Sequence, residues 1–407
     1  MSKLAFSLIV VFALIAAAPI NSRAALFNFS GGLDVYGTYD DNILLLSEDE
    51  IAESNVDPED YILQVHPYLQ LLAEGTRTSM ILYYQYYHEW YREEHNLDRT
   101  NTSFHDGYID LSWEATDRLT VSLYDLYRDS LYGLERDEVP EIRDDYRFNH
   151  FAPKIKYSDE DRFLIQGGFN WLIQNYEEAP IISEDGEIGY ADWEELGGQL
   201  DGEISLNTRT DVTVSTEFWE RVYDESRIAS YSDSQGYSVN LGLKQKLGEN
   251  FDMRGYAQYS HREFDDQIAE SEDTAYDGFG GSIELENRFK AYSGFTFRAF
   301  SRFEGSERIS GAFYRSTGLE GEFFTILGKH VETAFKFHYS QYSYDNVGEG
   351  WKDDFLRAAV TLGYRFNHWV SVRGQYQYSV RDSERPNDDF DNHLVSIYLH
   401  FSKDFNH

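Results

Sequence analysis

The sequence has 407 residues, 72 Asp and Glu against 35 Lys and Arg, a formal net charge of −37 and no Cys. The absence of Cys excludes disulfide scaffolds, thiolate metal sites and cysteine nucleophiles, and the strong acidity excludes binding to nucleic acid. Aromatic residues make up 16% of the chain, which argues against disorder. Because only one long apolar run is present, the chain is not a multi-helix membrane protein.

That apolar run lies at the N-terminus. It extends from Leu4 to Ala18, follows Lys3, and is succeeded by Ser22-x-Ala24, which has the small-x-small form of a cleavage site. Fifteen residues are too few to span a membrane comfortably. We therefore predict a secretory signal peptide over residues 1–24 and a mature chain over residues 25–407. An exported chain without Cys fits the envelope of a Gram-negative bacterium.

Beyond residue 26 the dominant pattern is the period of two that is typical of β-strands. Residues 370–381, for example, alternate Val, Gly and Tyr with Ser, Arg and Gln. Each such run is about ten residues long, as a tilted membrane-spanning strand requires. The pattern predicts eighteen strands, near residues 27–40, 61–73, 78–91, 103–114, 119–128, 147–157, 163–174, 193–206, 211–223, 236–246, 251–262, 276–287, 294–303, 312–324, 331–342, 354–366, 370–381 and 393–401.

The connections between these runs alternate in length. Short turns such as 74–77, 115–118 and 247–250 are interleaved with long segments such as 41–60 and 129–146. Short periplasmic turns and long extracellular loops are typical of an outer-membrane barrel. We therefore predict an all-β fold, a single transmembrane antiparallel β-barrel of about 18 strands in the cell outer membrane, with outer-membrane lipid and lipopolysaccharide as its surroundings.

The last predicted strand carries a candidate assembly signal. Its apolar positions, Val395, Ile397, Leu399 and Phe401, resemble the aromatic-terminated C-terminal signal that the barrel-assembly machinery reads. The alternative interpretation is one more amphipathic strand.

Most of the net charge lies in the nine long connections. Together they hold roughly 43 acidic and 8 basic residues, and segment 41–60 alone has eight acids and no base. One interpretation is that the acidic side chains only keep these long loops soluble. They would alternatively form a divalent-cation layer at the lipopolysaccharide surface, with Asp57-x-Glu59-Asp60 and Asp265-Asp266 as oxygen ligands, although no ordered calcium-loop spacing is present.

The polar face of the later strands has a different composition. The strand period places an excess of bases inside the predicted barrel, over acids such as Asp252, Glu284 and Glu320, where they would attract anions. The alternative is an Arg–Glu network that braces the wall. The candidate lumen and substrate-path residues are Lys244, Arg254, Arg262, Arg298, Arg302, Lys336, Arg357, Arg365, Arg373 and Arg381, together with Tyr256, Tyr314 and Tyr398 as rings that would stack on sugars.

Sequence motifs of catalysis are absent. No G-x-S-x-G, H-E-x-x-H, P-loop or dinucleotide-binding motif occurs in a suitable context. His88 beside Glu89 and His261 near Glu263 lack a neighbouring nucleophile. We therefore expect no enzyme and no cofactor, and we read Gly278-Phe279-Gly280-Gly281 as a strand bend or a close contact inside the barrel.

Two short motifs carry a resemblance to a known family. Residues 36–43 (YGTYDDNI) directly follow the signal peptide in the first strand, and residues 149–157 read NHFAPKIKY. With its eighteen-strand layout, the chain resembles the outer-membrane β-barrel porins associated with exopolysaccharide export, and it is similar in layout to the alginate exporter. The resemblance implies a barrel that passes secreted polysaccharide, often beside a periplasmic polysaccharide-export partner.

Three functions fit the sequence. The leading hypothesis is passive export of an anionic or neutral polysaccharide through a partly basic lumen. The second is a general or nutrient-uptake porin. The third is a structural or adhesive barrel whose acidic loops bind divalent ions.

Overall fold

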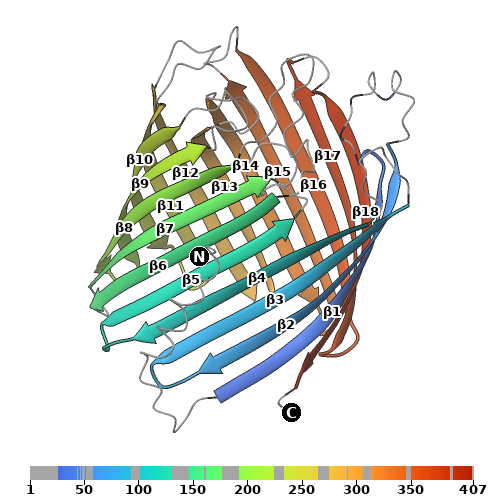
Figure 1. The fold of residues 1–407 in the computed structure, drawn as a ribbon, viewed down its shortest axis with the longest axis horizontal. Coiled ribbons are helices and arrows are strands. Elements are labelled where there is room, and N and C mark those ends of the chain that lie inside the picture. The colour runs from blue at the N-terminus through green and yellow to red at the C-terminus, as the bar shows by residue number, and fades with distance from the viewer. Residues whose placement is uncertain are drawn as a thin grey trace.

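The computed structural model describes residues 26–43, 45, 47, 51, 58–92, 101–130, 146–159, 162–176, 192–223, 233–264, 275–290, 292–305, 313–344, 350–385 and 388–405. The predicted signal peptide and most of the acidic loop positions lie outside these ranges. The described chain forms eighteen strands (Figure 1). They are β1 (Leu26–Asp40), β2 (Asp60–Glu74), β3 (Thr78–Tyr91), β4 (Asn101–Glu114), β5 (Leu119–Ser130), β6 (Tyr146–Asp159), β7 (Phe163–Tyr176), β8 (Trp193–Asn207), β9 (Thr210–Tyr223), β10 (Ser234–Lys246), β11 (Phe251–Phe264), β12 (Ala275–Lys290), β13 (Ser293–Gly305), β14 (Phe313–Leu327), β15 (Val331–Tyr344), β16 (Trp351–Arg365), β17 (Val370–Ser383) and β18 (Phe390–Asp404).

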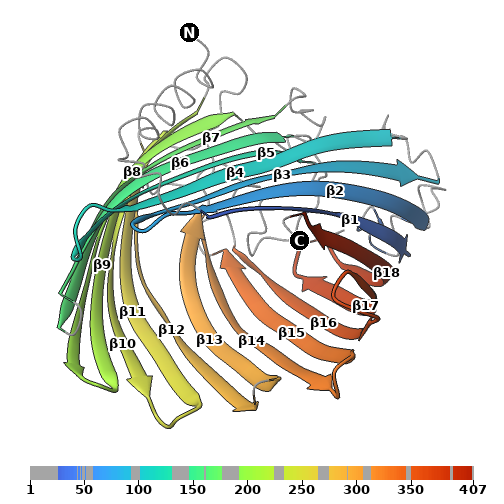
Figure 2. The same ribbon diagram turned by 90° about the horizontal axis from the view of Figure 1, so that it is seen from below.

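The strands close into a ring. Each strand pairs antiparallel with its neighbours in sequence, and β1 pairs with β18, for example Val35 opposite Leu399. Figure 2 shows the strands following one another in chain order around this ring. Because a closed ring leaves no unpaired strand edge, the backbone is satisfied without water. The predicted all-β barrel of eighteen strands is therefore confirmed.

No described segment is a helix of the length and apolarity needed to cross a membrane.

The observed strand bounds agree with the sequence prediction to within a few residues. The largest difference is at the C-terminal strand, which was expected over 393–401 and runs from Phe390 to Asp404. The extension pairs with the beginning of β1, where Asp404 lies opposite Ser30, and the Phe405 ring then packs 5.4 Å from that of Phe29. Pairing to β1, which local periodicity does not reveal, therefore sets the end of β18.

Alternate residues of each strand lie on two different faces. One face carries large apolar side chains that are exposed, such as Ile283, Leu362 and Ile397, at 57–59%. This is the lipid-facing side, since exposed apolar residues of a membrane barrel face hydrocarbon. The opposite positions, which we call the lumen-facing register, contain most of the charged residues of the strands.

Two adjacent glycines of β12 allow close approach of the neighbouring strands. A Cβ atom on Gly280 would lie 2.5 Å from the carbonyl oxygen of Ser301 in β13, and one on Gly281 would lie 2.4 Å from that of Tyr256 in β11. Neither backbone oxygen has room to yield, so only glycine fits. The interpretation of this segment as a close contact is confirmed.

A buried aromatic cluster fills the lumen-facing side at the end of the barrel where the long connections lie. It consists of Tyr314, Tyr342, Tyr344, Phe355 and Phe390. The rings of Tyr314 and Tyr344 lie 5.4 Å apart, and those of Phe355 and Phe390 lie 6.5 Å apart. The cluster joins β14, β15, β16 and β18 into one packed unit.

An ion pair is buried at the same end. The Arg381 guanidinium lies 2.5 Å from a carboxylate oxygen of Asp353, and the two side chains are 2% and 0% exposed. The Ser383 hydroxyl donates to the other oxygen of Asp353 at 2.5 Å. With both carboxylate oxygens bonded, this pair belongs to the framework of the barrel.

We predict that the Arg381→Gln variant lowers the free energy of unfolding by about 3–5 kcal/mol, because it leaves Asp353 buried without its cation. Arg365→Gln is the matched control, since Arg365 pairs with Glu332 but is half exposed, and it should cost at most about 1 kcal/mol. Urea unfolding of the refolded barrel, followed by its heat-modifiable electrophoretic mobility, measures both. Equal losses in the two variants would contradict the framework role.

Candidate functional site

A row of charged residues crosses the inner wall from β10 to β16. In the strand registers Lys244 lies opposite Arg254, Arg254 opposite Glu284, Glu284 opposite Arg298, and so on around the ring. We call this the charged row; its members are Lys244, Arg254, Glu284, Arg298, Glu320, His338 and Arg357. From Arg254 to Glu320 the charges alternate in sign, and cross-strand neighbours of opposite charge stabilise a sheet, so this part of the row strengthens the barrel wall and also faces the lumen.

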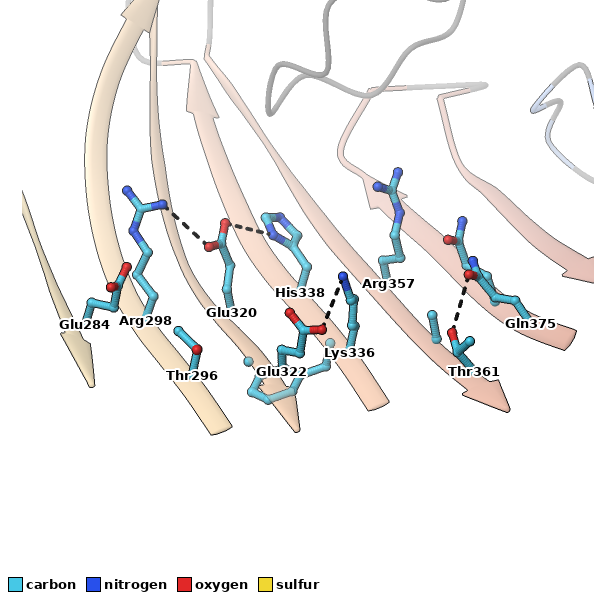
Figure 3. Close-up of a pocket in the computed structure, with 14 residues that line it drawn as sticks. Glu284, Thr296, Arg298, Glu320, Glu322, Lys336, His338, Arg357, Thr361 and Gln375 are labelled. Carbon is cyan, nitrogen blue, oxygen red and sulfur yellow. Dashed lines mark hydrogen bonds and ion pairs between the residues drawn. The ribbon is translucent and has the colours of Figure 1, made fainter. Parts of the chain in front are cut away.

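Ion pairs run along the charged row. An Arg254 nitrogen lies 3.1 Å from Glu284. Glu320 lies 3.6 Å from Arg298, 3.8 Å from Arg302 and 3.4 Å from His338. Figure 3 shows Glu320 between Arg298 and His338, with the Arg357 side chain beside them. One carboxylate thus lies among three basic groups.

A second group lies nearer the short turns. Arg373 approaches Glu332 at 3.0 Å, and Arg365 pairs with the other oxygen of the same carboxylate. Gly363 lies opposite Arg373, and a Cβ atom there would come within 3.0 Å of the Arg373 Cγ. Glycine at this position leaves space for the guanidinium, which also lies 5.7 Å from the centre of the Tyr398 ring.

Exposure divides the predicted bases into two kinds. Lys336 is 60% exposed and Arg373 43%, whereas Arg381 is 2% exposed. Exposed ion pairs are worth about 0–1 kcal/mol, so a solute anion can compete with their acidic partners. Buried pairs resist such exchange. Arg381 is therefore a wall residue, while Lys336 and Arg373 are accessible to a solute.

The accessible bases line two connected cavities. The first, about 490 Å³, is lined by Arg298, Lys336 and Arg357 among others. The second, about 620 Å³, shares Lys336 with the first and adds Arg373, Tyr36 and Tyr398. Volumes of this size match a small molecule. Figure 3 shows Lys336 and Glu322, an exposed pair 3.4 Å apart, beside Thr361 and Gln375.

All ten bases predicted for the lumen lie in the lumen-facing register. Tyr256 and Tyr398 do so as well. Tyr314 is 1% exposed in the aromatic cluster, so its ring does not face a solute path. The four assembly-signal residues, Val395, Ile397, Leu399 and Phe401, lie on the lipid-facing side and are 37–59% exposed; their recognition in assembly stays a prediction.

The opposite wall is acidic, which the sequence analysis missed. Among the described strand residues in the lumen-facing register, β1–β9 carry thirteen Asp or Glu and four Lys or Arg, whereas β10–β18 carry nine and twelve. The period of two in the first nine strands places these acids on the polar face as well, so it is the signal that predicts them. The lumen therefore has an acidic wall and a more basic wall.

An aromatic belt also went unpredicted. Tyr68, Tyr83, Tyr108 and Tyr124 lie on successive strands β2–β5, with consecutive ring centres 5.2–6.0 Å apart. The Tyr83 and Tyr87 hydroxyls both donate to Gln85, at 2.6 and 2.8 Å. This belt stiffens the acidic wall and gives it an apolar surface.

The histidines considered for catalysis are not arranged for it. His88 and Glu89 are neighbours in β3 and point to opposite faces, and His88 bonds the Ser103 hydroxyl at 2.7 Å. His261 bonds Asp277 at 2.7 Å on the lipid-facing side. No group of three or more potential metal ligands occurs among the residues that the structure describes. Of the proposed calcium ligands, Asp57, Asp265 and Asp266 lie outside the described residues.

Comparison with solved structures supports the fold. The Acinetobacter baumannii protein OccAB2 superimposes with a TM-score of 0.52 at 11% identity, over 93% of this chain and 98% of that one. OccAB3 of the same organism gives a TM-score of 0.50 at 10% identity, over 93% and 99%. At such low identity these similarities concern the barrel fold. No curated protein matches the chain.

A family model gives the assignment. The family described as "Putative beta-barrel porin 2" matches residues 22–403, nearly the whole chain. Its match agrees with the closed eighteen-strand barrel and the polar lumen, and it locates the chain in the outer membrane of a Gram-negative bacterium. The chain belongs to this family and is an outer-membrane β-barrel porin.

Proposed function

We propose that this porin is a passive uptake channel for small anionic solutes, which pass along the basic wall between β12 and β18. The observation that carries the proposal is the pair of connected cavities lined by Arg298, Lys336, Arg357 and Arg373. The exposed bases hold their own carboxylate partners weakly. A solute anion would replace such a partner briefly and then leave, as conduction requires.

The negative charge of the acidic wall keeps a permeating anion away from that wall. Carboxylates of β1–β9 repel an anion, while the cations on the other wall attract it. A permeating anion would therefore be confined to the side of the charged row. The net conductance of small ions, in contrast, reflects both walls, so potassium and chloride need not show strong discrimination.

Export of a polysaccharide was the leading hypothesis from sequence, and it is now the second candidate. Its support is the polar lumen and the resemblance of layout. The two cavities match small molecules, and the family is described only as porins, so uptake is better supported. The adhesive hypothesis depends mainly on loop residues outside the described ranges.

We predict that replacing Arg298, Arg357 and Arg373 together by Gln shifts the reversal potential in a KCl gradient towards cation selectivity. The shift should be larger at 0.1 M than at 1 M salt, because the Debye length falls from about 10 Å to about 3 Å. Planar-bilayer recording measures it. Arg315→Gln, which removes a base from the lipid-facing side, is the control. An unchanged reversal potential in the triple variant would overturn the anion path.

We predict a steep dependence of permeation on solute size. In liposome-swelling assays monosaccharides should enter much faster than tetrasaccharides, since each of the cavities of about 490–620 Å³ along the basic wall has the size of a site for one small molecule. Rapid and equal entry of both would favour polysaccharide export over uptake of small solutes.

A further inference from the structure

The larger lumen cavity combines aromatic and cationic groups. It lies where β14–β17 meet β18 and β1. Its lining includes an aromatic pair, Tyr36 and Tyr398, and two bases, Lys336 and Arg373, of which Arg373 lies over the Tyr398 ring at 5.7 Å. Its volume of about 620 Å³ is that of a site for one small molecule. The strand register brings Arg373 opposite Tyr398, and Tyr398 opposite Tyr36.

The aromatic pair of this cavity is held rigidly. The rings of Tyr36 and Tyr398 are stacked with centres 4.6 Å apart, and His66 lies 4.8 Å behind Tyr36. Asp34 accepts a hydrogen bond from the Tyr398 hydroxyl at 3.2 Å and contacts His400 Nδ1 at 2.6 Å. Both tyrosines remain partly exposed. Fixed rings that remain partly open offer apolar contact at small entropic cost.

The two bases of the cavity can still bind a solute anion. Arg373 shares Glu332 with Arg365, and a guanidinium has five N–H donors, so one shared carboxylate leaves donors for a second anion. Lys336 pairs with Glu322 at 3.4 Å and is 60% exposed. These two bases are therefore able to hold a solute carboxylate within the same cavity as the tyrosine pair.

Neutral polar groups complete the lining. Thr361, Gln375 and Ser396 also line the cavity, and they lie opposite one another on β16, β17 and β18. The Thr361 hydroxyl and the Gln375 side-chain oxygen lie 3.5 Å apart, at the limit of a hydrogen bond. Loosely engaged hydroxyl and amide groups suit the hydroxyls of a solute, because they donate and accept equally well.

From this combination we propose that the cavity binds a monomeric sugar acid, a six-membered ring that carries both hydroxyls and one carboxylate. The carboxylate lies against Arg373 and Lys336, the ring against Tyr36 and Tyr398, and the hydroxyls against Thr361, Gln375 and Ser396. The inference deepens the proposed anion uptake and rests on it. It adds a requirement for a ring and for hydroxyls, which an anion path alone does not impose.

The test uses four solutes that separate the three requirements: glucuronate (ring, carboxylate and hydroxyls), gluconate (no ring), benzoate (no hydroxyls) and glucose (no carboxylate). Each is titrated as a blocker of single-channel current in planar bilayers. Glucuronate should block at a concentration about fivefold or more below the other three. Equal block by glucuronate and gluconate, or by glucuronate and benzoate, would overturn the proposal.

Variants assign the effect to this cavity. In the Tyr36→Leu and Tyr398→Leu double variant, glucuronate should block no better than gluconate, whereas Tyr124→Leu, a lumen-facing tyrosine of β5 outside the cavity, should keep the preference. Arg373→Gln should weaken block by both acids. Heat-modifiable mobility establishes that each variant folds, and a preference retained by the folded double variant would overturn the site.

The same data distinguish the two proposals. If gluconate blocks the wild-type channel and the Arg373→Gln variant weakens that block, the anion path stands even where the ring preference fails. If neither acid blocks and the triple Arg variant leaves the reversal potential unchanged, the proposed function fails as well.

Discussion

Closure of the sheet is the constraint on which the rest of this structure depends. In a bilayer each backbone N–H and C=O must find a partner within the protein, and the pairing of β1 with β18 removes the last free edge. Once the ring is closed and hydrogen-bonded in register, the side of the wall that a residue occupies depends only on its place in the alternation. A shift by one residue in any strand would move charged side chains such as Arg298 and Glu320 into the lipid.

That same constraint explains how much of the structure was predictable. Alternation is a local property, so the eighteen strands and the lumen-facing positions of Arg298 or Arg373 followed from the sequence. Partnership between strands is not local. It depends on the relative stagger of neighbouring strands, and the ion pairs of Glu320 and the sharing of Glu332 by Arg365 and Arg373 appear only in the structure.

The burial of a lumen-facing residue, which depends on its position along the barrel axis, also could not be predicted from the sequence. Arg381 and Arg373 belong to the same strand and the same face, yet one is buried against Asp353 and the other is 43% exposed. The difference comes from the aromatic cluster at the end with long connections, whose rings converge from β14, β15, β16 and β18. Tyr314 takes part in this packing for the same reason. Residues on one face of a strand thus serve either as framework or as solute contacts according to what packs beside them.

The pairing of cations and carboxylates in the lumen has a consequence for transport. A row of unpaired arginines would bind an anion tightly and release it slowly, while fully buried pairs would not bind it at all. Pairs that remain exposed, such as Lys336 with Glu322 and Arg373 with Glu332, lie between these limits. Each carboxylate pairs with its cation when no solute is present, and a solute anion replaces it at little free-energy cost. The net charge of −37 is therefore a poor guide to the solute. Selection depends on a few exposed cations on one wall. The acids beside these cations keep the affinity of the cations for a solute anion low enough for the anion to pass.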